Sequence, residues 1–300
     1  MAPLGRISWM GQVDAVLASV SDMLYSWGLM WLLIGAGVFF TVRTRGVQVR
    51  HTDAIAASVV GSRDGSHGGI TSFQAFAVGL ACRVGTGNIA GVAVAVYTGG
   101  PGALFWMWIV ALLGMATAYA ESALAQLYKV NDHHGLYRGG PAFYISRGLK
   151  SPWAGAVFSV ALLVVFGLVF NAVQANAISE SFSESFGLDR TQVGVAVAVL
   201  SGIVIFGGIR NIARVAEVVV PFMAVAYLGV ALWVLVANVD KIPDVLVLIV
   251  RSAFGMDQAV GGVVGGMTAA MLNGVKRGLY SNEAGQGSAP NAAAAADVKH

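Results

Sequence analysis

Long apolar runs without charges alternate along the chain with short polar segments. A transmembrane helix needs about 20 mostly apolar residues, and several of these runs reach that length. We predict seven membrane spans, at residues 23–42, 70–98, 103–128, 151–179, 191–209, 215–239 and 258–280. The second and third spans come from one stretch whose single charge is Arg83, and residues 99–102 (GGPG) divide it because Gly and Pro interrupt helices.

Two other segments have an amphipathic pattern. Residues 10–27 place apolar side chains on one helical face and polar residues such as Asp14 and Asp22 elsewhere. Residues 242–254 have a similar character between the sixth and seventh spans. This pattern predicts helices that lie in the membrane interface.

The composition agrees with a membrane protein. Hydrophobic residues make up 57% of the 300 residues and charged residues 11%, against roughly 45–50% and about 25% in soluble domains. Disordered, fibrous and nucleic-acid-binding proteins are excluded by this balance. One cysteine cannot build a disulfide framework or a thiolate metal cluster. We predict an all-α, polytopic helix bundle, a single transmembrane domain over residues 1–300 whose surroundings are the lipid bilayer.

The distribution of Lys and Arg predicts the orientation. If the amino terminus lies outside, cytoplasmic segments hold 13 of the 18 basic residues, external segments hold 4, and Arg83 lies in the membrane. Cytoplasmic loops carry the excess of positive charge in membrane proteins. We therefore predict a multi-pass protein of the cell (inner) membrane with its amino terminus outside.

Span two contains a glycine-rich segment, residues 83–91 (RVGTGNIAG), at mid-membrane depth. Unwound backbone at this depth is tolerated where it is buried in protein or lines a cavity. Its freed carbonyls can coordinate a cation, and its amides can attract a carboxylate. Gly85, Thr86 and Asn88 are therefore candidate ligands for Na⁺. The same small residues fit tight helix packing equally well.

Span four carries amides in an otherwise apolar helix. Asn171 and Gln174 share one helical face, whereas Asn176 points elsewhere. Such amides can be simple interhelical hydrogen-bonding groups. Gln174 is the stronger candidate for a cavity-facing donor and acceptor.

Arg83 and Glu121 are the charges deepest in the apolar runs. A charge at this depth needs a partner, so we expect an ion pair or, for Glu121, snorkelling to the cytoplasmic surface. The pair His133 and His134 lies beside Asp132 without a third ligand nearby, and we predict no transition-metal site.

Four motifs resemble the sodium:alanine symporter family, also called alanine or glycine:cation symporters. They are residues 83–91, 99–114 (GGPGALFWMWIVALLG), 139–145 (GGPAFYI) and 282–290 (NEAGQGSAP). The resemblance runs in order from about residue 28 to the end of the chain. Departures are Gln286 in place of leucine and Ala142 in place of methionine.

This resemblance implies the leucine-transporter fold, with one extra helix ahead of two inverted five-helix repeats. Spans two to six would form the first repeat, and span seven would open the second. The glycine pairs 261–262 and 265–266 match the broken character of span two. Family members continue through four more helices, so we expect a carboxy-terminally truncated chain with an incomplete site.

The resemblance also implies a carrier, not an enzyme, that imports a small neutral amino acid (alanine or glycine) with Na⁺ as the coupling ion and no other cofactor. The amino acid would bind against Thr86, Gly87, Asn88 and Gln174, with Asn171 on the same face as Gln174. Alternatives are a cation or ammonium channel and an H⁺-coupled amino-acid carrier. An intramembrane hydrolase is disfavoured, because the spans hold no Ser/His or paired Asp arrangement.

Overall fold

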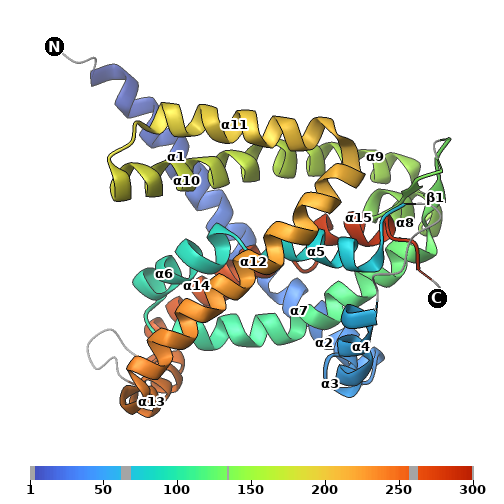
Figure 1. Ribbon diagram of the computed structural model, residues 1–300. Helices are drawn as coiled ribbons and strands as arrows, with labels where there is room; N and C mark the ends of the chain where they lie inside the picture. Colours follow the sequence, from blue (N-terminus) through green and yellow to red (C-terminus); the bar gives the residue numbers. More distant parts are fainter. Residues whose placement is uncertain (1–3, 62–68, 134, 257–262, 299–300) are drawn as a thin grey trace.

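The computed structural model describes residues 4–61, 69–133, 135–256 and 263–298, and helices dominate them (Figure 1). The first helices are α1 (Leu4–Leu24), a π-helical segment (Tyr25–Leu29), α2 (Met30–Arg43), α3 (Val47–Arg50) and α4 (Thr52–Gly61). There follow α5 (Ser72–Arg83), α6 (Thr86–Gly99), α7 (Gly102–Leu127), α8 (Pro141–Gly148) and α9 (Pro152–Val164). A second π-helical segment (Val165–Val169) leads to α10 (Phe170–Phe186), α11 (Arg190–Phe206) and α12 (Gly208–Ala237). The last helices are a 3₁₀ turn (Val239–Lys241), α13 (Ile242–Ala253), α14 (Val263–Asn282) and α15 (Ser288–Ala294).

A small amount of β structure adds to the expected all-α fold. Strands β1 (Val130–Asn131) and β2 (Tyr137–Arg138) pair antiparallel after α7, with Val130 opposite Arg138. A parallel bridge also joins Ile70, just before α5, to Ala296, just after α15. The bridge brings together the start of α5 and the segment after α15, which are far apart in the sequence.

Four helical segments of the described chain are long and apolar enough to cross a membrane. They are Ser72–Gly99, which comprises α5 and α6, then Gly102–Leu127, Pro152–Phe186 and Gly208–Ala237. Two shorter apolar helices are Met30–Arg43 and Arg190–Phe206. By length and composition the chain is a helical membrane protein, and the number of seven spans stays a prediction.

Two π-helical segments lengthen the helices beyond the predicted boundaries. Tyr25–Leu29 joins α1 to α2, so the predicted interfacial helix and first span form one helical run. Val165–Val169 joins α9 to α10, and that run continues to Phe186, past the predicted end at residue 179. Backbone angles stay right-handed helical on both sides of each π-helical segment, so neither run is interrupted.

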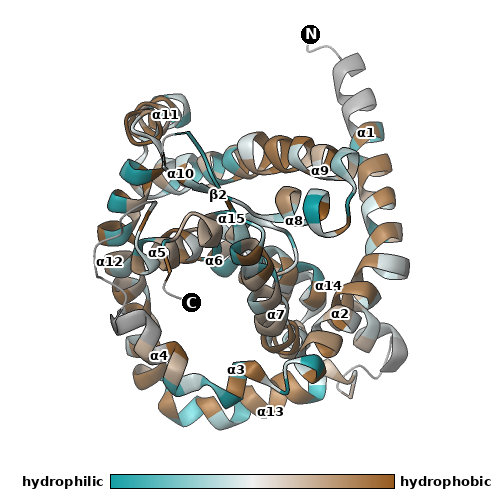
Figure 2. Cartoon of the chain, turned by 90° about the vertical axis from the view of Figure 1, so that its right-hand side faces the viewer, coloured by the Kyte–Doolittle hydropathy of each residue, from teal (hydrophilic) through white to brown (hydrophobic). Residues whose placement is uncertain are grey.

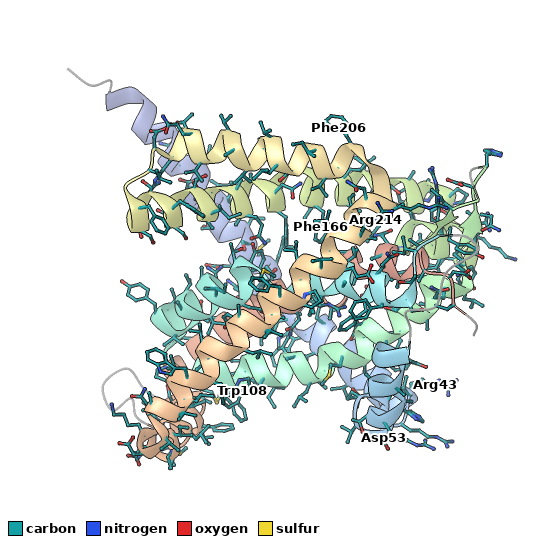
Figure 3. The ribbon with its side chains drawn as sticks, in the orientation of Figure 1. Arg43, Asp53, Trp108, Phe166, Phe206 and Arg214 are labelled. Carbon is teal, nitrogen blue, oxygen red and sulfur yellow. The ribbon has the colours of Figure 1, made fainter. Side chains whose placement is uncertain are left out.

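Large apolar side chains cover the outer helices. Figure 2 shows hydrophobic residues along α9 and α11, and Phe206, at the turn before α12, points outward in Figure 3. Phe206 is 94% exposed and Phe222 of α12 is 77% exposed. Such exposure would be unfavourable in water but suits hydrocarbon as the solvent.

Small residues dominate the contacts between the inner helices. A Cβ on Gly274 of α14 would lie 2.4 Å from the carbonyl oxygen of Ala103 in α7, and one on Gly102 would lie 2.3 Å from the amide nitrogen of Ala253 in α13. Van der Waals packing of closely spaced backbones replaces the hydrophobic effect in lipid. The buried cluster of Met30, Val110, Val275 and Leu279 joins α2, α7 and α14.

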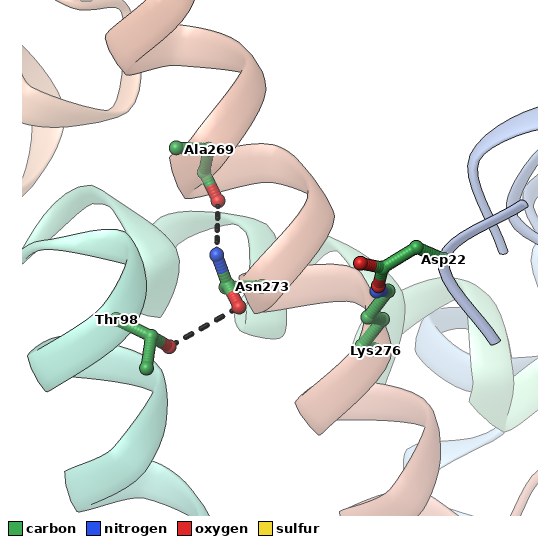
Figure 4. A network of polar contacts seen from close by, with 5 residues as sticks. All are labelled: Asp22, Thr98, Ala269, Asn273 and Lys276. Atoms are coloured by element: carbon green, nitrogen blue, oxygen red, sulfur yellow. Dashed lines mark hydrogen bonds and ion pairs between the residues drawn. The ribbon is translucent and has the colours of Figure 1, made fainter. Parts of the chain in front are cut away.

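Polar contacts fasten α14 to α6 and α1 (Figure 4). Thr98 Oγ1 donates to Asn273 Oδ1 at 3.1 Å, and Asn273 Nδ2 donates to the carbonyl of Ala269 at 2.9 Å. Lys276 forms an ion pair with Asp22. Lys276 and Arg277, near the end of the predicted seventh span at residues 258–280, lie within α14, because the helix continues to Asn282.

We predict that Gly274→Ala lowers the free energy of unfolding by about 1–3 kcal/mol, the usual cost of overpacking a close contact. The added methyl group would meet backbone atoms of α7, which cannot rotate away. Thermal unfolding in detergent measures the effect. Gly229→Ala is the matched control, because a Cβ there has nothing within 4 Å. An unchanged melting temperature for Gly274→Ala would contradict the packing argument.

Candidate functional site

The helix in the second apolar stretch is broken at Val84 and Gly85. Both residues are extended, between the end of α5 and the start of α6. A helix end leaves backbone carbonyls without partners, and a helix start leaves amides without partners. The predicted break at this glycine-rich segment therefore exposes both kinds of backbone group at one point.

A second break separates α14 from α15. Residues 283–287 form the connection, with positive φ angles at Glu283 (50°), Gly285 (84°) and Gly287 (82°). Glycine adopts these angles readily, whereas glutamate does so rarely. The carboxylate of Glu283 accepts a hydrogen bond from the Ser288 hydroxyl, which holds this conformation.

Of the two glycine pairs predicted to break the seventh span, the pair inside the described chain does not break it. Gly265 and Gly266 lie inside α14, and Gly261 and Gly262 lie outside the described residues. Adjacent glycines in a membrane helix can serve close packing, and they do not by themselves unwind it. The better signal was the Gly285-x-Gly287 spacing, which repeats that of Gly85 and Gly87.

The two breaks meet in the middle of the bundle, as Figure 1 shows for α5, α6, α14 and α15. A Cβ on Gly87 would lie 3.1 Å from both Ser281 Cα and Tyr280 Cδ1, so α6 and α14 are in close contact there. The Ser281 hydroxyl donates to Asn88 Oδ1. Asn88 Nδ2 donates to the carbonyl of Arg83 at the end of α5. Asn88 therefore spans the first break and joins it to the second.

Gln174 of α10 contributes a third side to this meeting point. Its Oε1 accepts the backbone N–H of Thr86 at 3.3 Å, and its amide lies against Gly85, where an added Cβ would be 2.8 Å from Nε2. One turn earlier, the ring of Phe170 packs against that of Tyr280 at 5.1 Å between centroids. The helix α10 thus contacts both broken helices.

Of the predicted residues, the structure brings together Gly85, Thr86, Gly87, Asn88 and Gln174. It does not connect Asn171 to them. The side chain of Asn171 is exposed, and its Nδ2 donates to the carbonyl of Gly167 in its own helix at 3.0 Å. Sequence reasoning missed Tyr280, Ser281 and Asn282, which end α14 at the meeting point.

At the start of α6 and the end of α14, three buried polar atoms have no hydrogen-bond partner among the described residues. They are Thr86 Oγ1, Tyr280 Oη and Asn282 Nδ2. A buried polar group without a partner is costly and calls for an explanation. These atoms come from the start of α6 and the end of α14, the two helix ends that are in contact at Gly87 and Ser281.

The deep charges have partners other than those expected. Glu121 of α7 accepts the backbone N–H of Gly285 at 3.0 Å, in place of an ion pair or an exposed position. Arg83 lies near enough to Glu121 and Glu283 for electrostatic interaction, although its Nε makes no hydrogen bond within the described chain. The second break is therefore held in part by the carboxylate of Glu121.

A cavity of about 290 Å³ extends from the first break along α5. Residues of α5, α7 and α15 line it, including Phe76, Gly79, Arg83, Ser122 and Ala293. At its far end, Lys129 Nζ donates to the carbonyl of Ala296 at 2.8 Å. Burial lowers the pKa of Lys129 below its ordinary value.

In the part of the chain that the structure describes, no three His, Cys, Asp or Glu side chains gather as a metal site.

Comparisons with known proteins agree with the motifs. A family model described as the sodium:alanine symporter family matches residues 10–300. The chain is 47% identical over 289 residues to a probable sodium/glutamine symporter, GlnT, of Bacillus subtilis, covering 96% of this chain and 60% of that protein. It is 47% identical over 280 residues to the amino-acid carrier protein AlsT of the same organism, covering 93% and 59%.

A third relative is the sodium/proton-dependent alanine carrier protein of Bacillus sp. strain PS3. It is 45% identical over 239 residues, which cover 78% of this chain and 52% of that protein. The chain thus spans between about half and three fifths of the length of these relatives. All three relatives are named as symporters or carriers, which are not enzymes.

We predict that Ser281→Ala lowers the free energy of unfolding by about 1 kcal/mol, because Asn88 Oδ1 loses a buried donor. Ser281 is 7% exposed. Ser181→Ala is the matched control, since Ser181 Oγ bonds only within its own helix, to the carbonyl of Ala177. Thermal unfolding of both variants in detergent provides the comparison. Equal melting temperatures would mean that the contact between Asn88 and Ser281 does not hold the breaks together.

Proposed function

The chain belongs to the sodium:alanine symporter family, and we propose that it carries a small neutral amino acid, alanine or glycine, into the cell together with Na⁺. The supporting observation is the set of buried polar atoms without partners where the two helix breaks meet. In the proposed leucine-transporter fold, such broken helices hold the substrate near the bilayer midplane.

The chemistry of the two breaks suits a zwitterion. We assign the carboxylate of the amino acid to the amide end of α6 and the hydroxyl of Thr86, where the helix dipole favours negative charge. The ammonium group is assigned to the carbonyl ends of α5 and α14, where the dipole favours positive charge. Gln174 would orient the ligand from α10, and Gly87, where α6 lies close to α14, would contact it through its backbone.

We assign Na⁺ to oxygen atoms of Gly85, Thr86 and Asn88. Carbonyl, hydroxyl and amide oxygens are suitable ligands for a hard cation, and unwound backbone in transporters supplies them. Coupling to one Na⁺ across 100 mV supplies about 2.3 kcal/mol. This is a roughly fifty-fold accumulation of substrate before any sodium gradient is added.

We also propose the orientation of the chain in the membrane and the way in which it transports its substrate. The amino terminus would lie outside, so that the ends of α2 and α7 reach the cytoplasm, and transport would proceed by alternating access in the inner membrane.

Reconstitution of the intact protein in proteoliposomes tests the function, with alanine, glycine and glutamine supplied in turn. Accumulation driven by a Na⁺ gradient is expected. Accumulation driven by a pH gradient alone would identify H⁺ as the coupling ion, and flux without counterflow would identify a channel.

We predict that Asn88→Ala abolishes Na⁺-coupled uptake while the protein still inserts in the membrane. The substitution removes an amide oxygen proposed for Na⁺ and the hydrogen bond from Ser281. Radiolabelled alanine uptake, normalised to the amount of protein in the membrane, measures the effect. Near-normal uptake with an unchanged sodium dependence would contradict the assignment.

A further prediction is that Gln174→Leu weakens substrate binding by about 1–3 kcal/mol, since the N–H of Thr86 and the ligand lose a hydrogen-bonding group. Asn176→Leu is the control on the same helix, because Asn176 is exposed. Substrate affinity can be measured by scintillation proximity binding on purified protein. A larger loss for Asn176→Leu would show that the wrong face of α10 had been assigned.

A further inference from the structure

The end of α2 and the short helix α3 carry three arginines within eight residues, Arg43, Arg45 and Arg50. All three residues are exposed, and none of them forms an ion pair with another residue that the structure describes. Arg138, predicted to lie on the same side of the membrane, differs because its Nε pairs with Asp132 Oδ2 at 3.0 Å. Figure 1 shows α3 and α4 together at one corner of the bundle. This corner therefore carries three guanidinium groups without an anionic partner in the described chain.

Hydrogen bonds hold the connection between α2 and α3 in a tight turn. The N–H of Arg45 donates to the carbonyl of Val42 at 3.0 Å, and that of Gly46 donates to the carbonyl of Thr41 at 2.8 Å. Gln48 Nε2 donates to Thr41 Oγ1 at 3.0 Å. The φ angle of Gly46 is 68°, which glycine adopts readily. These contacts fix the backbone of the turn without using any arginine side chain.

Apolar side chains on both sides of the turn are exposed as well. Phe39 and Val42 of α2 are 60% and 72% exposed, and Val49 of α3 is 72% exposed. Val47, by contrast, is buried, and α3 packs against α7. Figure 3 shows Arg43 at the outer edge of this corner. Exposed apolar side chains interleaved with exposed basic ones are typical of a segment at the boundary between hydrocarbon and lipid headgroups.

The charge of this surface is unbalanced. Between Arg43 and Ile55 the chain has three arginines and one carboxylate, that of Asp53, which is also exposed. A guanidinium group can bind phosphate through two parallel N–H bonds, so phosphate oxygens are suitable partners. A soluble anion would satisfy the arginines but would leave Val42 and Val49 uncovered. A phospholipid with a net negative charge supplies both a phosphate for the arginines and acyl chains for the valines.

We propose that residues 42–50, the arginine turn, bind the headgroup of an anionic phospholipid, with Val42 and Val49 against its acyl chains. The bound lipid holds the end of α2 at the depth of the headgroups. Placing this lipid in the cytoplasmic leaflet rests on the proposed orientation of the chain. The binding itself depends on neither the orientation nor the transport proposed above.

Native mass spectrometry of the intact protein in detergent micelles measures the binding of single lipids. Dioleoylphosphatidylglycerol is the anionic probe. Dioleoylphosphatidylcholine is the comparison, because its headgroup has the same phosphate but no net charge. Each lipid is titrated separately, at low and at high ionic strength. The melting temperature of every variant without added lipid shows whether that variant is folded.

The variants separate the charge of the turn from its fold. Arg43→Gln, Arg45→Gln and Arg50→Gln, singly and combined, remove charge but leave the backbone hydrogen bonds of the turn in place. Arg43→Lys, Arg45→Lys and Arg50→Lys, combined, keep the charge but lose the paired N–H groups. Arg138→Gln is the matched control for the single variants, because it removes one positive charge from an arginine that already has a partner.

We expect the parent protein to bind phosphatidylglycerol more tightly than phosphatidylcholine, with a smaller difference at high ionic strength. Each single glutamine variant of the turn should weaken phosphatidylglycerol binding about fivefold, equivalent to ~1 kcal/mol. The combined glutamine variant should bind the two lipids equally, and the combined lysine variant should be intermediate. Arg138→Gln should match the parent protein.

Equal affinity of the parent protein for the two lipids would overturn the proposal. An equal loss of binding in Arg138→Gln and in the single variants of the turn would do the same. Displacement of the bound lipid by glycerol 1-phosphate at equal concentration would show that the turn binds free phosphate, and the lipid would then be rejected as its partner. If the combined glutamine variant melts below the parent protein, the single variants decide the outcome.

Discussion

Every backbone amide and carbonyl within a bilayer needs a partner, and this constraint governs the centre of the molecule. Two helices break there, and only a few side chains form hydrogen bonds with the backbone amides and carbonyls that the breaks leave free. Asn88 caps the end of α5, Gln174 accepts the first amide of α6, and Glu121 accepts the amide of Gly285. Buried polar atoms without partners remain at the start of α6 and at the end of α14, which is why the place where these helix ends meet is the candidate binding site.

The surrounding helices provide this centre with a close and rigid frame. Gly274 and Gly102 allow the backbones of α7, α13 and α14 to approach to distances that a methyl group would prevent. Hydrogen bonds such as that from the Trp106 indole to the carbonyl of Ala253, at 3.2 Å, add to these contacts. In a bilayer, moving apolar surface from lipid into a helix contact gains little free energy. Van der Waals contacts between small residues therefore hold these helices together.

The sequence predicted the first break and its residues well, because the glycines around Thr86 and Asn88 combine low helix propensity with oxygen ligands. It did not predict the break after Asn282, because Gly285 and Gly287 differ from a glycine pair only in backbone angles, which the sequence does not show. Asn171 fails for another reason. It stands three residues before Gln174 in the same α-helix, so the two side chains point about 60° apart around the axis, and Asn171 is exposed. Its amide donates to the carbonyl of Gly167 in its own helix. Two of the four family motifs, residues 83–91 and 282–290, cover the two breaks.

The bridge between Ile70 and Ala296 has a consequence for biosynthesis. Ile70 donates its N–H to the carbonyl of Ala295 at 3.1 Å and accepts the N–H of Asp297 at 2.9 Å, and it is 1% exposed. These partners are made more than 220 residues later in the chain. At a synthesis rate of about 5–20 residues per second, the segment before α5 waits roughly 10–45 s for them. The first broken helix can therefore enter the membrane early, but the backbone of Ile70, just before it, gains these partners only after the second broken helix has been synthesised.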